Sequence, residues 1–114
     1  LYSAEISIVQ ANLENSFTNY PNPFNPEKGE ATTIGYVLSE DAHTDIELFT
    51  ITGKLVKQVV VDAFREAGSN QQDTWDGRNE RGLNVIPGTY FCRLTAMYAS
   101  GRTETLKRKI AVVR

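Results

Sequence analysis

The stretch that decides the fold is the longest clean alternation in the chain, Tyr90-Phe91-Cys92-Arg93-Leu94-Thr95-Ala96-Met97. Its Tyr, Cys, Leu and Ala residues alternate with a second set that includes Arg93 and Thr95. Successive side chains of a strand point to opposite faces, so this period of two predicts a strand with one face in the core. The same alternation recurs over Ile34–Leu38 and Thr44–Leu48, and the last segment, 103–114, offers Leu106, Ile110 and Val112 to one face.

Turn residues separate these segments. They are Thr52-Gly53, Asp76-Gly77-Arg78-Asn79 followed by Gly82, Pro87-Gly88 and Ser100-Gly101. Short strands with turns every 8–12 residues predict an all-β fold, an immunoglobulin- or fibronectin-III-like antiparallel sandwich of about seven strands. Two further segments complete the prediction.

The apolar run Leu55–Val61 fits a strand that is covered on both faces or carries a bulge. Asp62–Ala67 could form one helical turn at most. Gln71, Asp73 and Trp75 alternate with Gln72 and Thr74, which predicts that Trp75 points inward from a mostly polar strand.

The N-terminal part differs in composition. Residues 1–18 are expected to be a linker or the tail of a preceding domain, with room for one strand at Leu1–Val9, and the sandwich is expected over 19–114. Three of the four prolines fall within Tyr20–Pro26. Because proline lacks the N–H of a central strand, we expect a stiff, extended strap on an edge or surface, with Tyr20 and Phe24 packing down as anchors.

Composition excludes several classes of function. The 114 residues include 12 Lys and Arg against 14 Asp and Glu, for a net charge of −2, with one Cys and one His. Such a balance does not favour nucleic acid or a membrane surface as a partner, and no apolar run approaches the ~18 residues of a membrane span. One Cys excludes an internal disulfide. Leu1–Ala11 lacks the features of a signal peptide, so an exported chain would have to be part of a larger precursor.

Each candidate site also has a structural interpretation. Trp75 is expected to fill the core, with a sugar-stacking platform as the alternative. Asp76 and Asn79 are expected to cap their own loop, with Gly77 and Gly82 supplying its backbone conformation. A calcium site built from Asp73, Asp76 and Asn79 is the alternative for this loop.

The remaining chemistry is sparse. Asp41, His43 and Asp45 form the one cluster in the sequence that resembles a metal or acid–base site, since they would share one face of a strand. The register that buries Thr44 turns that face to water, so we expect solvated charges there. Cys92 alternates with buried positions and is expected to be an inert thiol. No acid–base pair, nucleophile or metal set remains, so we predict a protein that is not an enzyme and has no cofactor.

Five motifs together resemble one family. The chain is similar to the C-terminal sorting domains of the type IX (Por) secretion system, which are related to the immunoglobulin-like domain of the flagellar hook-capping protein. The matching stretches are Asn19–Pro26 (with Tyr20, Pro21, Asn22, Pro23 and Phe24), Leu48–Val56 (with Gly53), Trp75–Gly82, Val85–Phe91 (with Gly88 and Tyr90) and Lys109–Arg114. The resemblance does not cover residues 1–18. It departs from the family at Glu27–Glu30, which lengthens the segment, and at Pro87.

The resemblance implies a targeting module at the end of a larger secreted bacterial protein, read by the translocon after periplasmic transit and destined for secretion or the cell surface. Its partners would be translocon components and the covalently linked upstream domain. The residues implied for recognition are Lys109, Ile110, Ala111, Val112, Val113 and Arg114, on an exposed strand edge shaped by Gly88, Tyr90 and Gly101. The basic residues there could serve recognition, edge protection, or both.

Two alternatives come from other classes of function. One is a structural assembly domain of the hook-capping type, and the other is an accessory carbohydrate-binding module of a secreted enzyme. The chain ends within a few residues of its last expected strand, which favours the sorting interpretation over the assembly interpretation.

Overall fold

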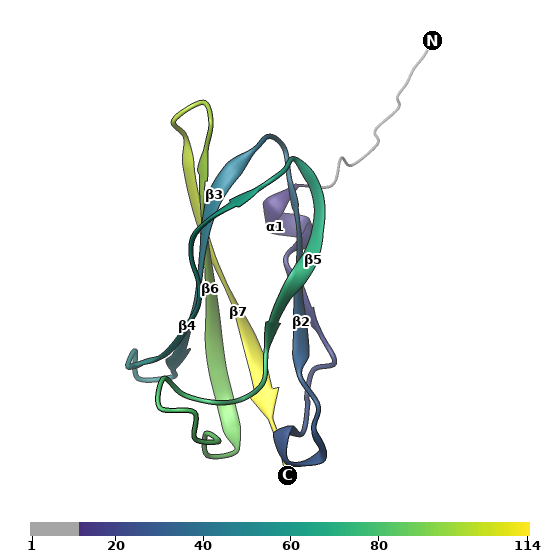
Figure 1. Cartoon of the computed structure of the whole chain (residues 1–114), viewed down its shortest axis with the longest axis vertical. Coiled ribbons are helices and arrows are strands. Elements are labelled where there is room, and N and C mark those ends of the chain that lie inside the picture. Colours follow the sequence, from purple (N-terminus) through teal and green to yellow (C-terminus); the bar gives the residue numbers. More distant parts are fainter. Residues whose placement is uncertain (1–11) are drawn as a thin grey trace.

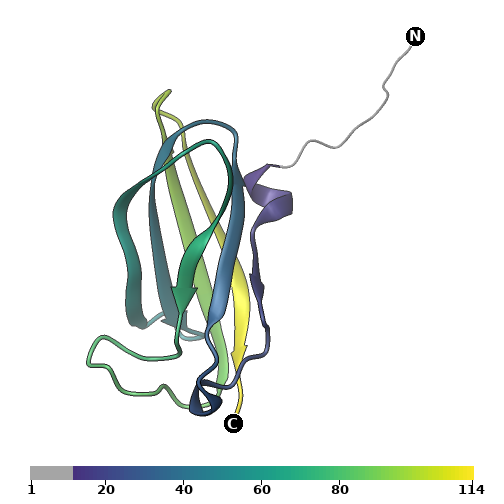
Figure 2. The same cartoon turned by 45° about the vertical axis from the view of Figure 1, so that its right-hand side comes forward.

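In the described part of the chain, seven strands form two antiparallel sheets that face each other across one core, as the two layers in Figures 1 and 2 show. The computed structural model describes residues 12–114. One sheet has the order β1-β2-β5 and the other β4-β3-β6-β7. The strands are β1 (Thr18–Tyr20), β2 (Thr32–Leu38), β3 (Ala42–Thr50), β4 (Leu55–Arg65), β5 (Gly68–Trp75), β6 (Gly88–Tyr98) and β7 (Thr103–Val112). The predicted all-β sandwich is therefore confirmed.

The core follows the alternation in the sequence. Each clean period-two segment buries the predicted face, and the inward positions of β6 continue to Tyr98. The buried apolar residues of the long strands include Ile34, Tyr36, Leu38, Ile46, Leu48, Cys92, Leu94, Ala96, Ile110 and Val112. The register between β6 and β7 runs unbroken from Gly88 to Met97. Each side chain of β7 can therefore be assigned to the core face or to the outer face of the sheet.

A bulge interrupts the alternation in β5. Gly35 of β2 lies opposite both Gln71 and Gln72 of β5, since Ile34 pairs with Asp73 and the next pairing is two residues further along β2 and three along β5. The extra residue reverses the alternation in β5. Trp75 is buried as predicted and Asp73 is buried with it, whereas Gln71 is exposed.

The apolar strand β4 is an edge strand, not a strand covered on both faces. Its valine-rich sequence leaves Val61 62% exposed, and Phe64 is 52% exposed. The other alternative, a bulged strand, is confirmed by three register shifts between β3 and β4. Asp62 lies in the left-handed region with φ of 49°. The segment 62–67, which could have formed one helical turn at most, forms none, because β4 continues to Arg65.

The sandwich begins before Asn19. A helical turn, α1 (Leu13–Ser16), is capped by the side chain of Asn12, and it buries Leu13, while the next residue, Phe17, is also in the core. Residues 13–18 are therefore part of the domain and not a linker, because their apolar side chains complete the core. The strand expected at 1–9 lies outside the described residues.

Candidate interaction surface at the terminal strand

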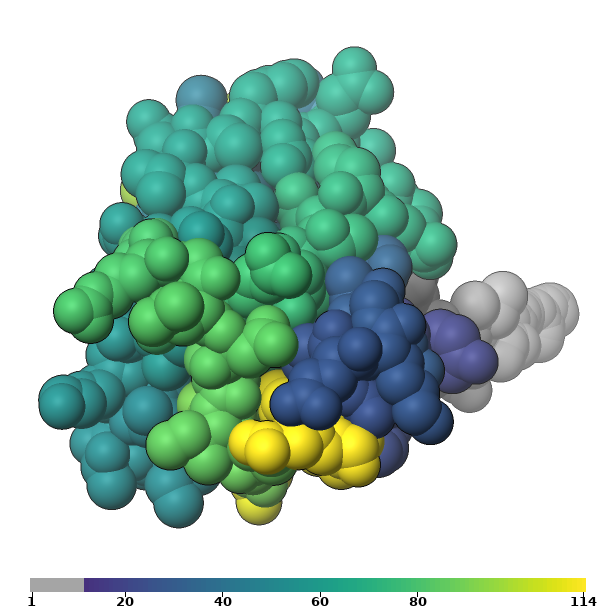
Figure 3. Space-filling view, turned by 60° about the horizontal axis from the view of Figure 1, so that its bottom comes forward, coloured from purple at the N-terminus to yellow at the C-terminus, as the bar shows by residue number. Residues whose placement is uncertain are grey.

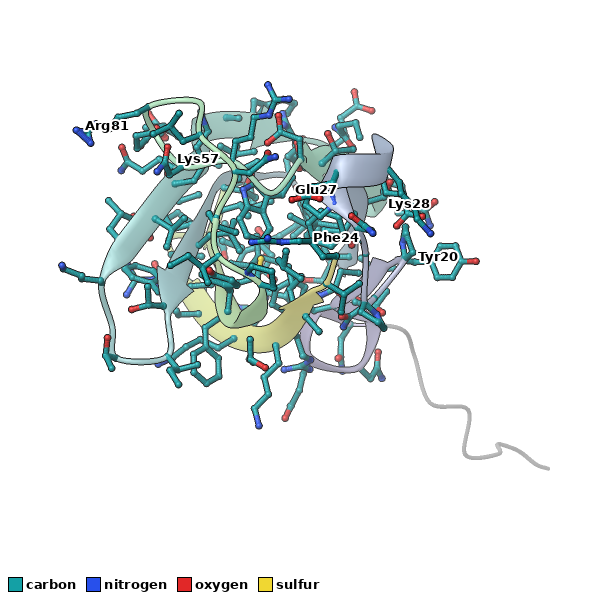
Figure 4. All side chains as sticks on the ribbon, turned by 90° about the horizontal axis from the view of Figure 1, so that it is seen from below. Tyr20, Phe24, Glu27, Lys28, Lys57 and Arg81 are labelled. Carbon is teal, nitrogen blue, oxygen red and sulfur yellow. The ribbon has the colours of Figure 1, made fainter. Side chains whose placement is uncertain are left out.

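The proline strap places one aromatic residue in the core and one in water. Phe24 is fully buried, and its ring meets Trp75 edge-on at 5.6 Å, while Trp75 in turn meets Tyr90 at 5.7 Å. Trp75 therefore fills the core, as predicted. Tyr20 is 78% exposed and points away from the body in Figure 4, so its predicted role as a second anchor is wrong. The reason is the alternation of β1, which turns Asn19 inward and both of its neighbours outward.

The strap is less extended than its prolines predicted. It bends over residues 21–23, where Tyr20–Pro21 and Asn22–Pro23 are cis, and it ends in a 3-10 helix, η1 (Pro26–Lys28). Gly77 explains how closely this helix meets the opposite loop. A Cβ atom on Gly77 would lie 2.4 Å from the Cγ atom of Pro26, so only glycine allows this contact.

The strap forms hydrogen bonds along the outer edge of β7. Phe24 donates its N–H to the carbonyl of Ala111 (3.1 Å) and accepts from the N–H of Val113 (3.0 Å). The amide side chain of Asn22 extends this pairing, since it donates to the carbonyl of Lys109 (3.2 Å) and accepts from the N–H of Ala111 (2.9 Å). The strap and the chain end lie side by side in Figure 3. The edge at residues 109–113 is thus already occupied.

The six residues implied for recognition divide by burial. Ile110 and Val112 are core residues that are not accessible to a partner, and Ala111 is partly buried. Lys109, Val113 and Arg114 face solvent. Arg114 also pairs with Glu27 of the strap, with 3.3 Å between Nε and the carboxylate. Recognition of a folded module through this segment would therefore involve the three exposed side chains.

Further along β7, the edge is open. The last residue that a neighbouring segment contacts is Arg108, which donates to the carbonyl of Glu14 and lies over the ring of Phe17. Within residues 12–114, no other segment forms a hydrogen bond with the outer edge of Thr103, Thr105 or Lys107, although the adjacent Arg108 side chain donates to the carbonyl of Lys107 (2.9 Å). β7 thus has a closed half and an open half.

The loop after Trp75 is stabilised by hydrogen bonds between its own residues. Asp76 accepts from the N–H of Arg78, and Asn79 accepts from the N–H groups of Arg81 and Leu83, so both cap their own loop as predicted. Gly77 and Gly82 have φ of 80° and 78°, values that favour glycine. Gly88, which shapes the start of β6, has φ of 152°.

The alternative calcium ligands do not converge. Asp73 instead lies between the sheets, where it accepts a 2.6 Å bond from Arg65 and a 2.8 Å bond from the hydroxyl of Tyr36. Burial, followed by this bond to Asp73, raises the pKa of Tyr36 to about 12. Over residues 12–114, no group of three His, Cys, Asp or Glu side chains could hold a metal ion.

The acidic residues around His43 support the neighbouring backbone. Asp41 accepts from the N–H of Ala67 and Asp45 from the N–H of Asp62, while His43 pairs with the Asp62 carboxylate at 3.2 Å. Cys92 is fully buried, and burial raises the pKa of its thiol to about 12. These residues have structural partners or lie beyond the reach of solvent.

Sequence reasoning missed a cationic aromatic surface on the outer face of the four-stranded sheet. Phe49 of β3 lies opposite Phe91 of β6, and a hollow of about 180 Å³ opens beside them. The Arg93 guanidinium covers the Phe49 ring at 4.5 Å, and the Lys107 ammonium lies 5.8 Å from the centre of the Phe91 ring. The signal was the outward position of each residue within its alternation. Because cations cover both rings, this face does not resemble an open sugar-stacking platform.

No family model matches the chain, and no curated protein matches it. Several solved structures are similar to it, among them the following two. Dimeric latent PorU from Porphyromonas gingivalis superimposes with a TM-score of 0.64 at 21% identity, over 86% of this chain and 9% of that protein. FlgD from P. aeruginosa superimposes with a TM-score of 0.62 at 19% identity, over 79% of this chain and 65% of that one. These similarities agree with the relationship that the motifs indicated, and at this identity they show the fold.

Within the part of the chain that the structure describes, no helix is long and apolar enough to cross a membrane.

Proposed function

We propose that this chain is a non-catalytic sorting module of a larger secreted bacterial protein, read by the type IX secretion machinery. The observation that carries the proposal is the match of nearly the whole domain to a small part of PorU, a protein of that system, together with the five sequence motifs. On this proposal, the parent protein crosses the periplasm and is delivered to the medium or the cell surface, and translocon components contact the module.

The arrangement of the terminal strand supports a recognition element carried on a rigid domain. Ile110 and Val112 anchor the segment in the core, and the strap holds its backbone through Asn22 and Phe24. The exposed side chains of Lys109 and Arg114 are thereby held at fixed positions beside the strap. A folded address of this kind requires no pocket or catalytic group.

The similarity to FlgD supports a second candidate function, that of a structural assembly domain of the hook-capping type. The chain matches 65% of FlgD with a TM-score close to that for PorU. An assembly domain would act by packing against further copies, so it should self-associate when purified. A sorting module should act on cargo as a single copy.

The test is a fusion of this segment to a secreted reporter in a strain with an active type IX system. We expect delivery of the reporter to the surface or medium, and retention in the periplasm when the segment is removed. Deleting residues 109–114 would remove Ile110 and Val112 from the core and confuse recognition with unfolding, so the matched variants are Lys109→Glu with Arg114→Glu, against Lys28→Glu with Lys54→Glu as a control of equal charge change.

Retention of the double variant at 109 and 114, with normal delivery of the control, supports a recognition role for these residues. Equal delivery of both pairs removes Lys109 and Arg114 from the proposal. Equal delivery with and without the whole segment removes the sorting function.

A further inference from the structure

The outer edge of β7 changes character at Arg108. Because the register to β6 is unbroken, backbone groups alternate strictly between β6 and the outer edge. Ala111 and Val113 direct their N–H groups to the strap, so the outward-directed residues are the odd-numbered ones. Thr103, Thr105 and Lys107 follow the same alternation. Among residues 12–114, the one group that bonds to these outward backbone positions is the side chain of the adjacent Arg108, which donates to the carbonyl of Lys107 (2.9 Å).

Two lysines without an ion pair lie at the boundary between the open and the closed halves of β7. Lys107 and Lys109 lie on the outer face of the sheet, and neither forms an ion pair with a described carboxylate. Arg93, opposite Lys107 on β6, already has Glu47 as its partner at 2.6 Å. The surface next to the open edge therefore carries two lysine charges with no counter-charge, although the chain as a whole is acidic.

We propose that the open edge of β7, Thr103–Lys107, binds an extended acidic segment of a partner protein as a fifth strand of the four-stranded sheet. The added strand would pair with the outward backbone groups of Thr103, Thr105 and Lys107. Its alternate side chains would lie on the outer face beside Lys107 and Lys109, where carboxylates find their counter-charges. Main-chain pairing supplies affinity and the charge match selects the partner.

The proposal deepens the sorting function, because it names the edge that a secretion component would read, and it rests on that function for the identity of the partner. It also moves the expected contact with the partner from residues 109–113 to residues 103–107. Strand addition along residues 109–113 would have to displace Asn22 and Phe24 of the strap, and Phe24 is a core residue. Addition along 103–107 displaces only the exposed hydrogen bond from the Arg108 side chain to the carbonyl of Lys107.

The test is a titration of the 114-residue chain, labelled with ¹⁵N, with a short blocked peptide that alternates glutamate and valine. We expect the amides of Thr103, Thr105 and Lys107 to shift and to exchange more slowly with solvent. Thr105→Pro removes an outward donor that β6 does not use, and we expect it to weaken binding by at least about tenfold. Lys107→Glu should do the same, and Lys28→Glu should bind like the wild type. Circular dichroism verifies that each variant is folded.

The outcomes separate this inference from the proposed function. Normal reporter delivery combined with no peptide binding, or with shifts confined to residues 109–113 or to the loops, overturns the open edge as the site. Equal binding of a peptide that alternates lysine and valine overturns the acidic chemistry. A wild-type dimer formed through 103–107 replaces the partner by a second copy and also overturns the proposal. Peptide binding at 103–107 without reporter delivery retains the site and rejects the sorting function.

Discussion

Gly77 shows how one residue joins the strap to the opposite loop. Its φ is 80°, and a Cβ atom there would lie 2.4 Å from Pro26, so a side chain meets both an unfavourable backbone conformation and a collision. Gly82, in the same loop, has φ of 78° with no atom within 4 Å of such a Cβ. A comparison of substitutions at Gly77 and Gly82 therefore separates the cost of the backbone conformation from the cost of the collision.

We predict that Gly77→Ala lowers the free energy of unfolding by about 1–3 kcal/mol more than Gly82→Ala, because overpacking adds to the shared cost of the left-handed conformation. Urea denaturation of both variants measures the difference. Equal losses would show that η1 moves aside without cost.

Asp73 is the residue on which the buried polar cluster depends. It accepts from Tyr36 and pairs with Arg65, whose side chain is 17% exposed. We predict that Asp73→Asn lowers the free energy of unfolding by about 3 kcal/mol, because it leaves the guanidinium largely buried without its counter-charge. The control is Glu27→Gln, which breaks the exposed pair with Arg114 and should leave the urea midpoint nearly unchanged. Similar midpoints for the two variants would contradict a structural role for the Asp73 cluster.

At the scale of elements, the strands that pair regularly could be predicted from sequence. Ile34, Tyr36 and Leu38 alternate cleanly, and so do the inward residues of β6, because period two maps directly onto the two faces of a sheet. Gln71 could not be placed, because the bulge opposite Gly35 depends on pairing with another strand. The left-handed conformation of Asp62 in β4 likewise depends on pairing with another strand.

The candidate surface was predictable only in part. The basic end of the chain is visible in the sequence, but its division into closed and open halves depends on where the strap runs. The amide of Asn22 replaces a strand at 109–111, a contact between residues nearly 90 positions apart that no local pattern reveals. Tyr20 is similar, since its exposure follows from the register of β1 with β2.

The helical turn α1 provides the test at this scale. Leu13 is 1% exposed and Phe17 is 4% exposed, although the surrounding sequence is polar and irregular. We predict that Leu13→Ala lowers the free energy of unfolding by about 2–5 kcal/mol, the cost of emptying a buried site. Glu14→Ala, on the exposed side of the same turn, is the matched control for helix propensity. Equal stability of the two variants in urea would show that residues 13–18 act as a linker and do not contribute to the core.

At the scale of the whole molecule, one end of the four-stranded sheet is closed on both edges. Asn22 and Phe24 cover β7, and Glu80 covers β4, since it accepts from the N–H of Gln58 and donates to the carbonyl of Val56. The hairpin from β6 to β7 rises at the upper left of Figure 1, away from the strap, and leads into the open stretch of β7. The open edge therefore lies toward one end of the domain, so a partner strand could add there and not at the closed end.

The core as a whole determines how the domain responds to alkali. Tyr36 belongs to the three-stranded sheet and Cys92 to the four-stranded sheet, and burial is the largest cause that raises each pKa to about 12, from 10.0 and 9.0. Below about pH 8, a unit under the lower of these ordinary values, both groups keep their protons in the folded and unfolded chains, so their contribution is fully present. Above those ordinary values, the unfolded chain loses protons that the folded chain retains until about pH 12.

We therefore predict that the free energy of unfolding falls as pH rises above 9, by about 1.4 kcal/mol per pH unit for each group once it titrates in the unfolded chain. Urea midpoints from pH 7 to 11 measure the slope. Tyr36→Phe should reduce the slope above pH 10, and Cys92→Ala should reduce it from pH 9, whatever stability each loses at neutral pH. Because the two groups lie in different sheets, the reductions should add in the double variant. A slope that neither substitution changes would mean that alkali acts elsewhere than on the core shared by the two sheets.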